Sequence, residues 1–352
     1  MEPRKSTKAL CAFLRLTVSV LPDLKGYLPV DADVVDGRPG LRWLDMSGVS
    51  LSEPFFEQTV ERAKADGRGE VFTEFDMLLQ LEKLLDTLEP TGFIFHSSRC
   101  GSTLVANACR AVSNSIVLSE ANPIDKLIAR FITDAGDKVK ESLYSVFLRA
   151  VVRALGQRRS GDEQHLLIKF ACCSFSQIER ITRIWPNVRW LFLYRDPIET
   201  IVSNLNEIPP WLIDKDRRVL AAINGVSPAA VAEMRLEELC ARTIGSLYAT
   251  AHRLANANSM LLNYTQLSVP EIVKVLRFFN VSPSSDEMDE IARRSGLYSK
   301  EASGSREFVA DAHAKQQHAS VLIREMAAAW ASEPYRLLEQ KRIQSNNLVN
   351  QS

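Results

Sequence analysis

The sequence lacks the features that mark several large classes of protein. None of its six cysteines forms a CxxC pair and none of its five histidines lies in an HExxH motif, so neither a disulfide framework nor a metal site is indicated. Lys+Arg and Asp+Glu both number 43, and a chain without a basic excess is a poor candidate for binding nucleic acid or an anionic membrane. No run approaches the roughly 18 uncharged apolar residues of a transmembrane helix. The nearest, residues 9–21, contains Arg15 and is expected to form an amphipathic helix. We therefore expect a cytoplasmic protein with no metal, nucleic-acid or membrane partner.

What the sequence does contain is a change of pattern near residue 91. Before it, the chain is expected to be mainly helical, because Ser52 can cap a helix that Gly67 ends and Thr73 can cap a second that Pro90 ends. After it, short apolar runs alternate with helical patterns. The runs are 93–96, 116–118, 166–170, 190–194 and 260–263, and the helical patterns include 102–112, 123–133, 138–155, 175–185 and 198–206. Unbroken apolar runs are typical of strands that a parallel sheet buries on both faces.

This alternation predicts an α/β fold with a doubly wound parallel sheet of about five strands. We expect a mainly helical N-terminal region over 1–90, packed on an α/β domain over 91–340, and a frayed tail over 341–352. Residues 299–320 are polar and are expected to form a long loop that is a candidate lid. In such folds, ligands bind beyond the carboxyl ends of the strands.

The sharpest local motif joins the first apolar run to the first helical pattern. It reads Arg99-Cys100-Gly101-Ser102-Thr103 after His-Ser-Ser, a tight turn of small residues between a strand and a helix. Such a turn directs several backbone N–H groups and a helix N-terminus at one point, which suits a phosphate or sulfate. Against a Walker A loop, Ser102 stands where the lysine belongs. Taken alone, the motif also fits an ordinary strand–turn–helix with capping serines, a solvated arginine and a cysteine as small filler.

A second motif follows the buried run at 190–194. Arg195-Asp196-Pro197 begins a helical pattern, and Ser203 stands eight residues after the arginine. Read structurally, Asp196 caps the helix, Pro197 is its first residue and Arg195 is a surface cation. Asp196 can also be read as a Walker B aspartate.

Together the two motifs make the sequence resemble the P-loop sulfotransferases, which use 3'-phosphoadenosine 5'-phosphosulfate (PAPS). In that family a Lys/Arg-x-Gly-Ser/Thr-Thr loop holds the 5'-phosphosulfate, and a later Arg-Asp/Asn-Pro with a serine holds the 3'-phosphate. Residues 99–103 fit the first pattern, and Arg195 with Ser203 fits the second at the same spacing. Residues 262–267 resemble a weaker Arg-Tyr-Glu-Asp-Leu segment, with uncharged residues in place of the charged ones. The resemblance covers residues 92–281.

The resemblance implies which residues hold PAPS. Arg99 would neutralise the leaving 5'-phosphate, and Arg195 and Ser203 would bind the 3'-phosphate. Ser299 and Lys300 are expected to close over the nucleotide. The rest of the phosphate loop would add hydrogen bonds from Cys100, Gly101, Ser102 and Thr103.

The resemblance also implies the catalytic groups. Lys169 matches the sulfate-contacting lysine of the cytosolic members, whose neighbouring histidine is absent here. Glu120, 21 residues after Arg99, matches the glutamate that membrane-type and several bacterial members use as the general base. Burial would raise its pKa toward neutrality. Read structurally, Glu120 caps the helix near 123, and His96 is the lesser candidate for the base.

We therefore expect a sulfotransferase that moves the sulfuryl group of PAPS to a hydroxyl or amine of a small molecule or carbohydrate, without a metal. Two alternatives remain open. One is a P-loop kinase that uses Mg-ATP, against which the missing Walker lysine and the arginine before Asp196 count. The other is a catalytically inactive nucleotide-binding protein of the same fold. The sequence identifies neither the acceptor nor the oligomeric state.

Overall fold

The parallel sheet contains all five predicted apolar runs. The computed structural model describes residues 22–81, 83–214, 216–296 and 312–349. In chain order the strands of this sheet are β4 (Gly92–His96), β5 (Ser115–Ser119), β6 (His165–Lys169), β7 (Arg189–Tyr194) and β8 (Ser259–Asn263). Their order in the sheet is β5-β6-β4-β7-β8, and every neighbouring pair is parallel. All five carboxyl ends therefore lie at one edge, and the predicted α/β fold with a five-stranded parallel sheet is confirmed.

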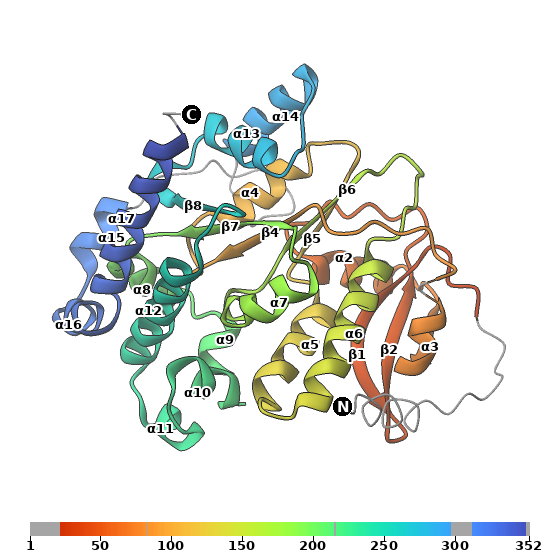
Figure 1. The fold of residues 1–352 in the computed structure, drawn as a ribbon, viewed down its shortest axis with the longest axis horizontal. Coiled ribbons are helices and arrows are strands. Elements are labelled where there is room, and N and C mark those ends of the chain that lie inside the picture. The colour runs from red at the N-terminus through yellow and green to blue at the C-terminus, as the bar shows by residue number, and fades with distance from the viewer. Residues whose placement is uncertain (1–21, 82, 215, 297–311, 350–352) are drawn as a thin grey trace, which may run out of the picture.

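Helices cover both faces of this sheet (Figure 1). Along β4, Phe93 and Phe95 point into the larger core and Ile94 into the smaller one, which is the alternation of a strand buried on both sides. The smaller core is closed by α4 (Ser102–Cys109), α13 (Val269–Phe278) and α14 (Ser285–Ser295). The other helices that follow β4 are α5 (Asn122–Thr133), α6 (Lys138–Leu155), η1 (Cys172–Gln177), α7 (Ile178–Ile184), α8 (Pro197–Asn206), α9 (Pro210–Ile213), α10 (Arg218–Asn224), α11 (Pro228–Glu233), α12 (Leu236–Leu254), η2 (Tyr264–Gln266), α15 (Ala312–His318), α16 (Val321–Trp330) and α17 (Ser332–Val349).

The expectation of a mainly helical N-terminal region is wrong. From residue 22 on, its described residues form a three-stranded antiparallel sheet of order β1-β2-β3 together with two helices. Its elements are β1 (Tyr27–Val35), β2 (Arg38–Asp45), α2 (Phe56–Ala65), β3 (Glu70–Glu74) and α3 (Phe75–Leu81). Two predicted helix caps do not cap: α2 begins after Phe55 rather than at Ser52, and Thr73 lies in β3, where its Oγ1 accepts a hydrogen bond of 2.8 Å from Trp43 Nε1.

A two-residue turn folds β1 back on β2. Val35 pairs with Arg38 across Asp36 and Gly37, whose φ angles are 49° and 76°. Positive φ at both central residues matches the right-handed twist of a hairpin, and Asp-Gly is a preferred pair for it. This dipeptide was the sequence signal for the missed sheet.

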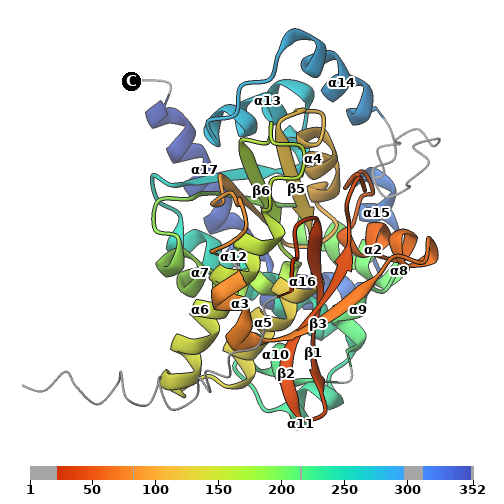
Figure 2. The ribbon, with the colours of Figure 1, turned by 90° about the vertical axis from the view of Figure 1, so that its right-hand side faces the viewer.

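The antiparallel sheet packs beside the helices that follow β5. β1 contacts α5 and α6, as Figure 2 shows from the side. Asp31 of β1 accepts hydrogen bonds from Asn122 Nδ2 at 2.9 Å and Lys126 Nζ at 2.6 Å, both on α5. The N-terminal sheet therefore lies against the start of α5, the helix that follows β5 at one end of the parallel sheet.

Several sequence expectations concern the first residues of the chain, the predicted lid and the C-terminal tail. The amphipathic helix expected at 9–21 and the candidate residues Ser299 and Lys300 lie outside the described residues. The last part of the predicted lid is the helix α15, and α17 continues to Val349 within the predicted frayed tail. Among the helices in the described ranges, none has the length and hydropathy needed to cross a bilayer.

Candidate functional site

The parallel sheet brings a polar side chain from each strand to its carboxyl edge. In sheet order these are Glu120 after β5, Lys169 at the end of β6, His96 at the end of β4, Arg195 after β7 and Asn263 at the end of β8. The phosphate loop follows β4, the middle strand, and so lies between the Glu120 side and the Arg195 side. Four of these five residues were predicted from sequence as candidate site residues, and the fold places them along one edge.

The phosphate loop has a left-handed backbone. Ser98, Arg99 and Gly101 have φ angles of 72°, 51° and 84°, and such residues turn successive N–H groups toward one side, which creates an anion-binding concavity. Within the described part of the chain, the N–H groups of Arg99, Gly101 and Thr103 donate to no protein acceptor. A Cβ at Gly101 would lie 2.5 Å from Leu267 Cδ2, so the loop requires glycine there for both steric and conformational reasons.

The side chains of the loop differ in their surroundings. Ser102 and Thr103 begin α4 without capping it, because its N-cap is Gly101 and no side chain caps the helix. Cys100 is buried, its Sγ lies 3.2 Å from the carbonyl oxygen of Leu193, and burial raises the pKa of this thiol to about 11. The thiol therefore remains protonated at neutral pH, as expected of a packing residue rather than a nucleophile.

Arg99 is held by the end of α8. Its Nη1 donates to Glu207 Oε2 at 2.7 Å, and its Nη2 donates to the Glu207 carbonyl. The Arg99 side chain is 10% exposed, whereas that of Glu207 is 68% exposed. A ligand phosphate that binds Arg99 must compete with Glu207 for the guanidinium. Glu207 was not identified from the sequence.

Arg195 is deeply buried and its side chain is fixed from several sides. Its Nε donates to Glu199 Oε2 at 2.6 Å, and the guanidinium lies 4.1 Å from the ring centroid of Tyr264. The carbonyl of Arg195 accepts a hydrogen bond of 2.6 Å from the Tyr248 hydroxyl. With a side chain only 3% exposed, Arg195 is not the surface cation of the structural reading.

Asp196 acts as the N-cap of α8. Its side chain accepts from the N–H groups of Ile198 and Glu199 at 2.9 and 3.2 Å, and Gln316 Nε2 of α15 donates to it at 2.9 Å. Burial raises the pKa of Asp196. The capping reading of this residue is thus confirmed.

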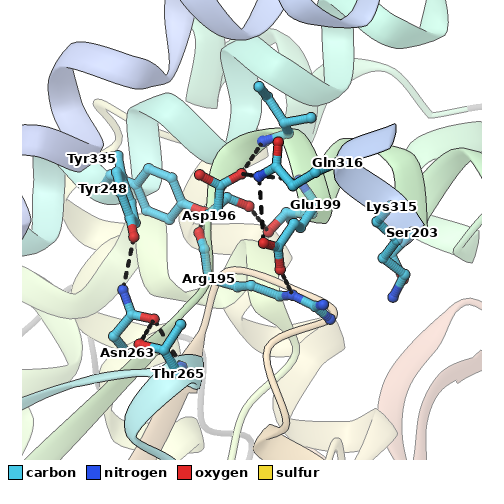
Figure 3. Close-up of polar contacts among 12 residues, drawn as sticks. Arg195, Asp196, Glu199, Ser203, Tyr248, Asn263, Thr265, Lys315, Gln316 and Tyr335 are labelled. Carbon is cyan, nitrogen blue, oxygen red and sulfur yellow. Dashed lines mark hydrogen bonds and ion pairs between the residues drawn. The ribbon is translucent and has the colours of Figure 1, made fainter. Parts of the chain in front are cut away.

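The helix α15 places the ammonium group of Lys315 next to Ser203. Lys315 Nζ donates to Ser203 Oγ at 3.2 Å, and in Figure 3 the Arg195 guanidinium extends toward the side where this pair lies. Asn263, at the lower left of Figure 3, accepts from the Thr265 N–H at 3.0 Å and donates to the Tyr335 hydroxyl at 2.9 Å. An amide therefore supports the end of β8 where the resembling segment has charged residues.

On the other side of the loop, two groups converge on one oxygen of Glu120. Lys169 Nζ donates to Glu120 Oε1, and His96 Nε2 lies 3.5 Å from the same oxygen. Glu120 has a φ of 53°, and residues with a Cβ in this left-handed region are uncommon outside turns and functional sites. It is not the cap of α5, because the N-cap is Ala121.

The Glu120 carboxylate has a lowered pKa, which corrects the expectation of a raised one. Burial acts to raise it, but the charge of Lys169 and the contact with His96 outweigh burial and lower the pKa to about 2. Burial lowers the pKa of His96. Glu120 is therefore ionised and paired in this structure.

Two further residues border this pair and were not identified from sequence. The ring of Phe55, just before α2, lies 4.9 Å from Lys169 Nζ. Asp125 of α5 accepts from Ser174 Oγ at 3.1 Å, and burial together with the charge of Glu120 raises its pKa to about 7. Phe55 connects the N-terminal region to the carboxyl edge of the parallel sheet, a contact that no local sequence pattern signals.

Comparison with known proteins returned structures only. No family model and no curated protein matches the sequence. A sulfotransferase from Alicyclobacillus acidocaldarius is 15% identical, with 65% of this chain and 99% of that chain covered and a TM-score of 0.38. STF9 from Mycobacterium avium is 10% identical, with 72% and 80% covered and a TM-score of 0.42. Mouse SULT7A1, solved in complex with PAP, is 12% identical, with 76% and 86% covered and a TM-score of 0.33. The chain is thus similar to solved sulfotransferases at low identity, and a likeness of this degree says nothing about its activity.

Proposed function

We propose that the chain is a PAPS-dependent sulfotransferase acting on a hydroxyl or amine of a small molecule or carbohydrate. The observation that carries this proposal is the pairing of two anion sites on one sheet edge: the left-handed loop after β4 and the buried Arg195 with Ser203 and Lys315. A nucleotide with a phosphosulfate and a separate phosphate needs two such sites. The Glu120–Lys169 pair beside the loop supplies the groups for the transfer.

The loop would hold the 5'-phosphosulfate through backbone N–H groups and the N-terminus of α4. Arg195 would hold the 3'-phosphate, because a guanidinium already fixed by Glu199 and Tyr264 loses little conformational freedom on binding. Lys315 would add a second positive charge through its contact with Ser203. These roles rest on the resemblance together with the geometry.

Bound PAPS supplies an electrophilic sulfur with a phosphate leaving group. In the transfer, Glu120 accepts the proton of the acceptor hydroxyl as the new S–O bond forms and the bond from sulfur to the bridging oxygen breaks. The electron pair of that bond leaves with the 5'-phosphate, where Arg99 and the loop N–H groups neutralise the charge. Lys169 stabilises the charge on the transferred oxygens.

Glu120 must separate from Lys169 before it can act as a base. A carboxylate with a pKa of about 2 is too weak a base near neutrality. When Lys169 turns to an anionic ligand oxygen, Glu120 loses its positive partner and burial then raises its pKa. Nucleotide binding would therefore activate the base.

The kinase alternative has no support in the geometry of Asp196. A Walker B aspartate directs its carboxylate toward Mg²⁺, whereas both N–H groups that open α8 and the Gln316 amide already contact the Asp196 carboxylate. Ser102 also supplies no ammonium to a γ-phosphate.

The experiment is calorimetric titration of the full chain with adenosine 3',5'-bisphosphate, with adenosine 5'-monophosphate and with Mg-ATP. We expect the bisphosphate to bind at least about tenfold more tightly than the monophosphate, because only it reaches Arg195. Ser203→Ala and Lys315→Gln should reduce this difference and leave monophosphate binding unchanged. Arg195→Ala should abolish this difference, and Arg189→Ala, at the opposite end of β7, is its matched control for the loss of an arginine.

Each outcome selects one function. Preference for Mg-ATP, or a bisphosphate affinity indifferent to Ser203 and Lys315, would overturn the proposal. Tight bisphosphate binding without any turnover of PAPS would indicate the inactive nucleotide-binding protein.

A further inference from the structure

His96 contributes a hydrogen-bond donor to the catalytic edge. The backbone N–H of Ser98 donates to His96 Nδ1 at 3.0 Å, so Nδ1 carries no proton. In a neutral imidazole the proton must then be on Nε2. The hydrogen-bond network thus assigns the tautomer, and a ring in this state has no nitrogen left to accept a proton from an acceptor hydroxyl.

The Nε2 atom of His96 lies near the oxygen that Lys169 contacts. Nε2 lies 3.5 Å from Glu120 Oε1, which is longer than an ordinary N–H···O hydrogen bond. The His96 side chain is 8% exposed, and within the described residues Nε2 has no hydrogen-bond partner. A buried N–H without an acceptor destabilises the folded state, so its retention points to an acceptor that is a ligand.

We propose that Lys169 and His96 form a two-donor site for an oxygen of the transferred sulfonate group, and that Glu120 Oε1 occupies this site in the present structure. The inference rests on the proposed function and adds a catalytic residue to it. Glu120 Oε1 is an anionic oxygen held by an ammonium group and faced by a neutral N–H, as a sulfonate oxygen would be.

The site fits the charge changes of the transfer. An incoming sulfonate oxygen takes the place of Oε1, and Glu120 turns toward the acceptor, whose proton it receives. Charge on the sulfonate oxygens then lies between Lys169 and His96, and no proton leaves either donor. His96 therefore acts by hydrogen bonding rather than as the base.

Two substitutions separate the two nitrogens of His96. His96→Asn keeps an acceptor for the Ser98 N–H but removes the donor toward Glu120. His96→Gln keeps a donor near the position of Nε2 but removes the acceptor at Nδ1. His96→Asn thus tests the loss of the donor, and His96→Gln tests the loss of the contact with the loop.

The first measurement needs no identified acceptor. Inorganic sulfate is titrated into the protein saturated with adenosine 3',5'-bisphosphate, where it should occupy the sulfonate position. We expect His96→Asn to weaken sulfate binding by at least about tenfold while bisphosphate affinity stays within about twofold, and His96→Gln to retain most of the sulfate affinity. Equal sulfate affinity in wild type and His96→Asn, or no sulfate binding to the wild-type complex, would overturn the inference.

The second measurement is hydrolysis of PAPS, with water as the acceptor. The His96→Asn rate should fall about 100-fold, the usual effect of removing one oxyanion donor, and by the same factor at every pH from about 6 to 9. A rate loss confined to the alkaline side of the ionisation of an imidazole would assign His96 as the base and refute the donor role. Failure of the wild type to bind the bisphosphate would instead refute the proposed function itself.

Discussion

Removing the ammonium group of Lys169 should destabilise the folded chain by way of Glu120. Burial alone would raise the pKa of Glu120, but Lys169 and His96 lower it from 4.5 to about 2. At about 1.4 kcal/mol per unit of pKa, the ionised carboxylate stabilises the fold by about 3 kcal/mol. Lys169→Met retains the length and apolar stem of a side chain that is 1% exposed. We therefore expect the free energy of unfolding at pH 7 to fall by about 3 kcal/mol, the order found when one partner of a buried ion pair is removed.

The pH dependence of this loss has a defined sign. In the wild type the folded-state pKa of Glu120 lies below its ordinary value. The stabilisation that its carboxylate gives the folded state is therefore complete above pH 4.5 and is lost as the pH falls through about 2. In Lys169→Met, burial without the ammonium raises the pKa above the ordinary value. The difference in free energy of unfolding between the wild type and Lys169→Met therefore grows as the pH rises through that raised pKa and is smallest in acid.

The assay is urea denaturation followed by tryptophan fluorescence, which the buried Trp43 and Trp190 should report. Wild type, Lys169→Met, Glu120→Gln and the double variant are compared from about pH 4 to pH 8. Glu120→Gln should restore most of the stability lost in Lys169→Met, because no buried charge then lacks a partner. A Lys169→Met variant as stable as wild type at pH 7, or one whose deficit Glu120→Gln does not relieve, would refute the reasoning.

Three further perturbations test other parts of the site. Gly101→Ala should cost more stability than Gly37→Ala, because both glycines have a positive φ but only the Cβ added at Gly101 meets a side chain, at 2.5 Å. In denaturation experiments we expect a loss of about 1 kcal/mol for Gly37→Ala and at least twice that for Gly101→Ala, and equal losses would contradict the steric argument. Glu207→Gln should strengthen bisphosphate binding by up to about fivefold, because it removes the carboxylate that pairs with Arg99 while the bond to the backbone carbonyl remains. Unchanged or weaker binding in calorimetry would be the opposing result. Iodoacetamide at pH 8 should leave Cys100 unmodified in the native chain and label it after unfolding, because burial raises its pKa to about 11; native-state labelling seen by mass spectrometry would count against a buried thiol.

The parallel sheet was predictable because its signal is local. Each strand is a short apolar run, and such runs are typical of strands that are buried on both faces. The edge residues followed from that prediction, since the carboxyl ends of parallel strands meet at one edge. Lys169 and Arg195 could therefore be placed from sequence although they lie on different strands.

The N-terminal sheet was missed because its strands are only partly buried and are irregular. The pairing of β1 with β2 shifts register between Pro29 and Asp31, which breaks the alternation that marks a strand. Helical interpretation then rested on single capping residues, and Thr73 turned out to accept a hydrogen bond from Trp43 inside the sheet. A capping residue predicts a helix only where the hydrophobic pattern agrees with it.

The pKa of Glu120 could not be predicted because its sign depends on a competition between two large effects. Burial disfavours the carboxylate and a neighbouring ammonium favours it, and residue spacing does not reveal whether Lys169 lies at 4 Å or 8 Å from Glu120. In the structure the two groups form an ion pair, so the ammonium prevails and the resting residue is a weak base. If Glu120 is the base, the chain needs a means of separating this pair, and an anionic ligand that attracts Lys169 is the simplest one. The activity of the base would then depend on the nucleotide, and an acceptor that arrived first would find Glu120 still paired.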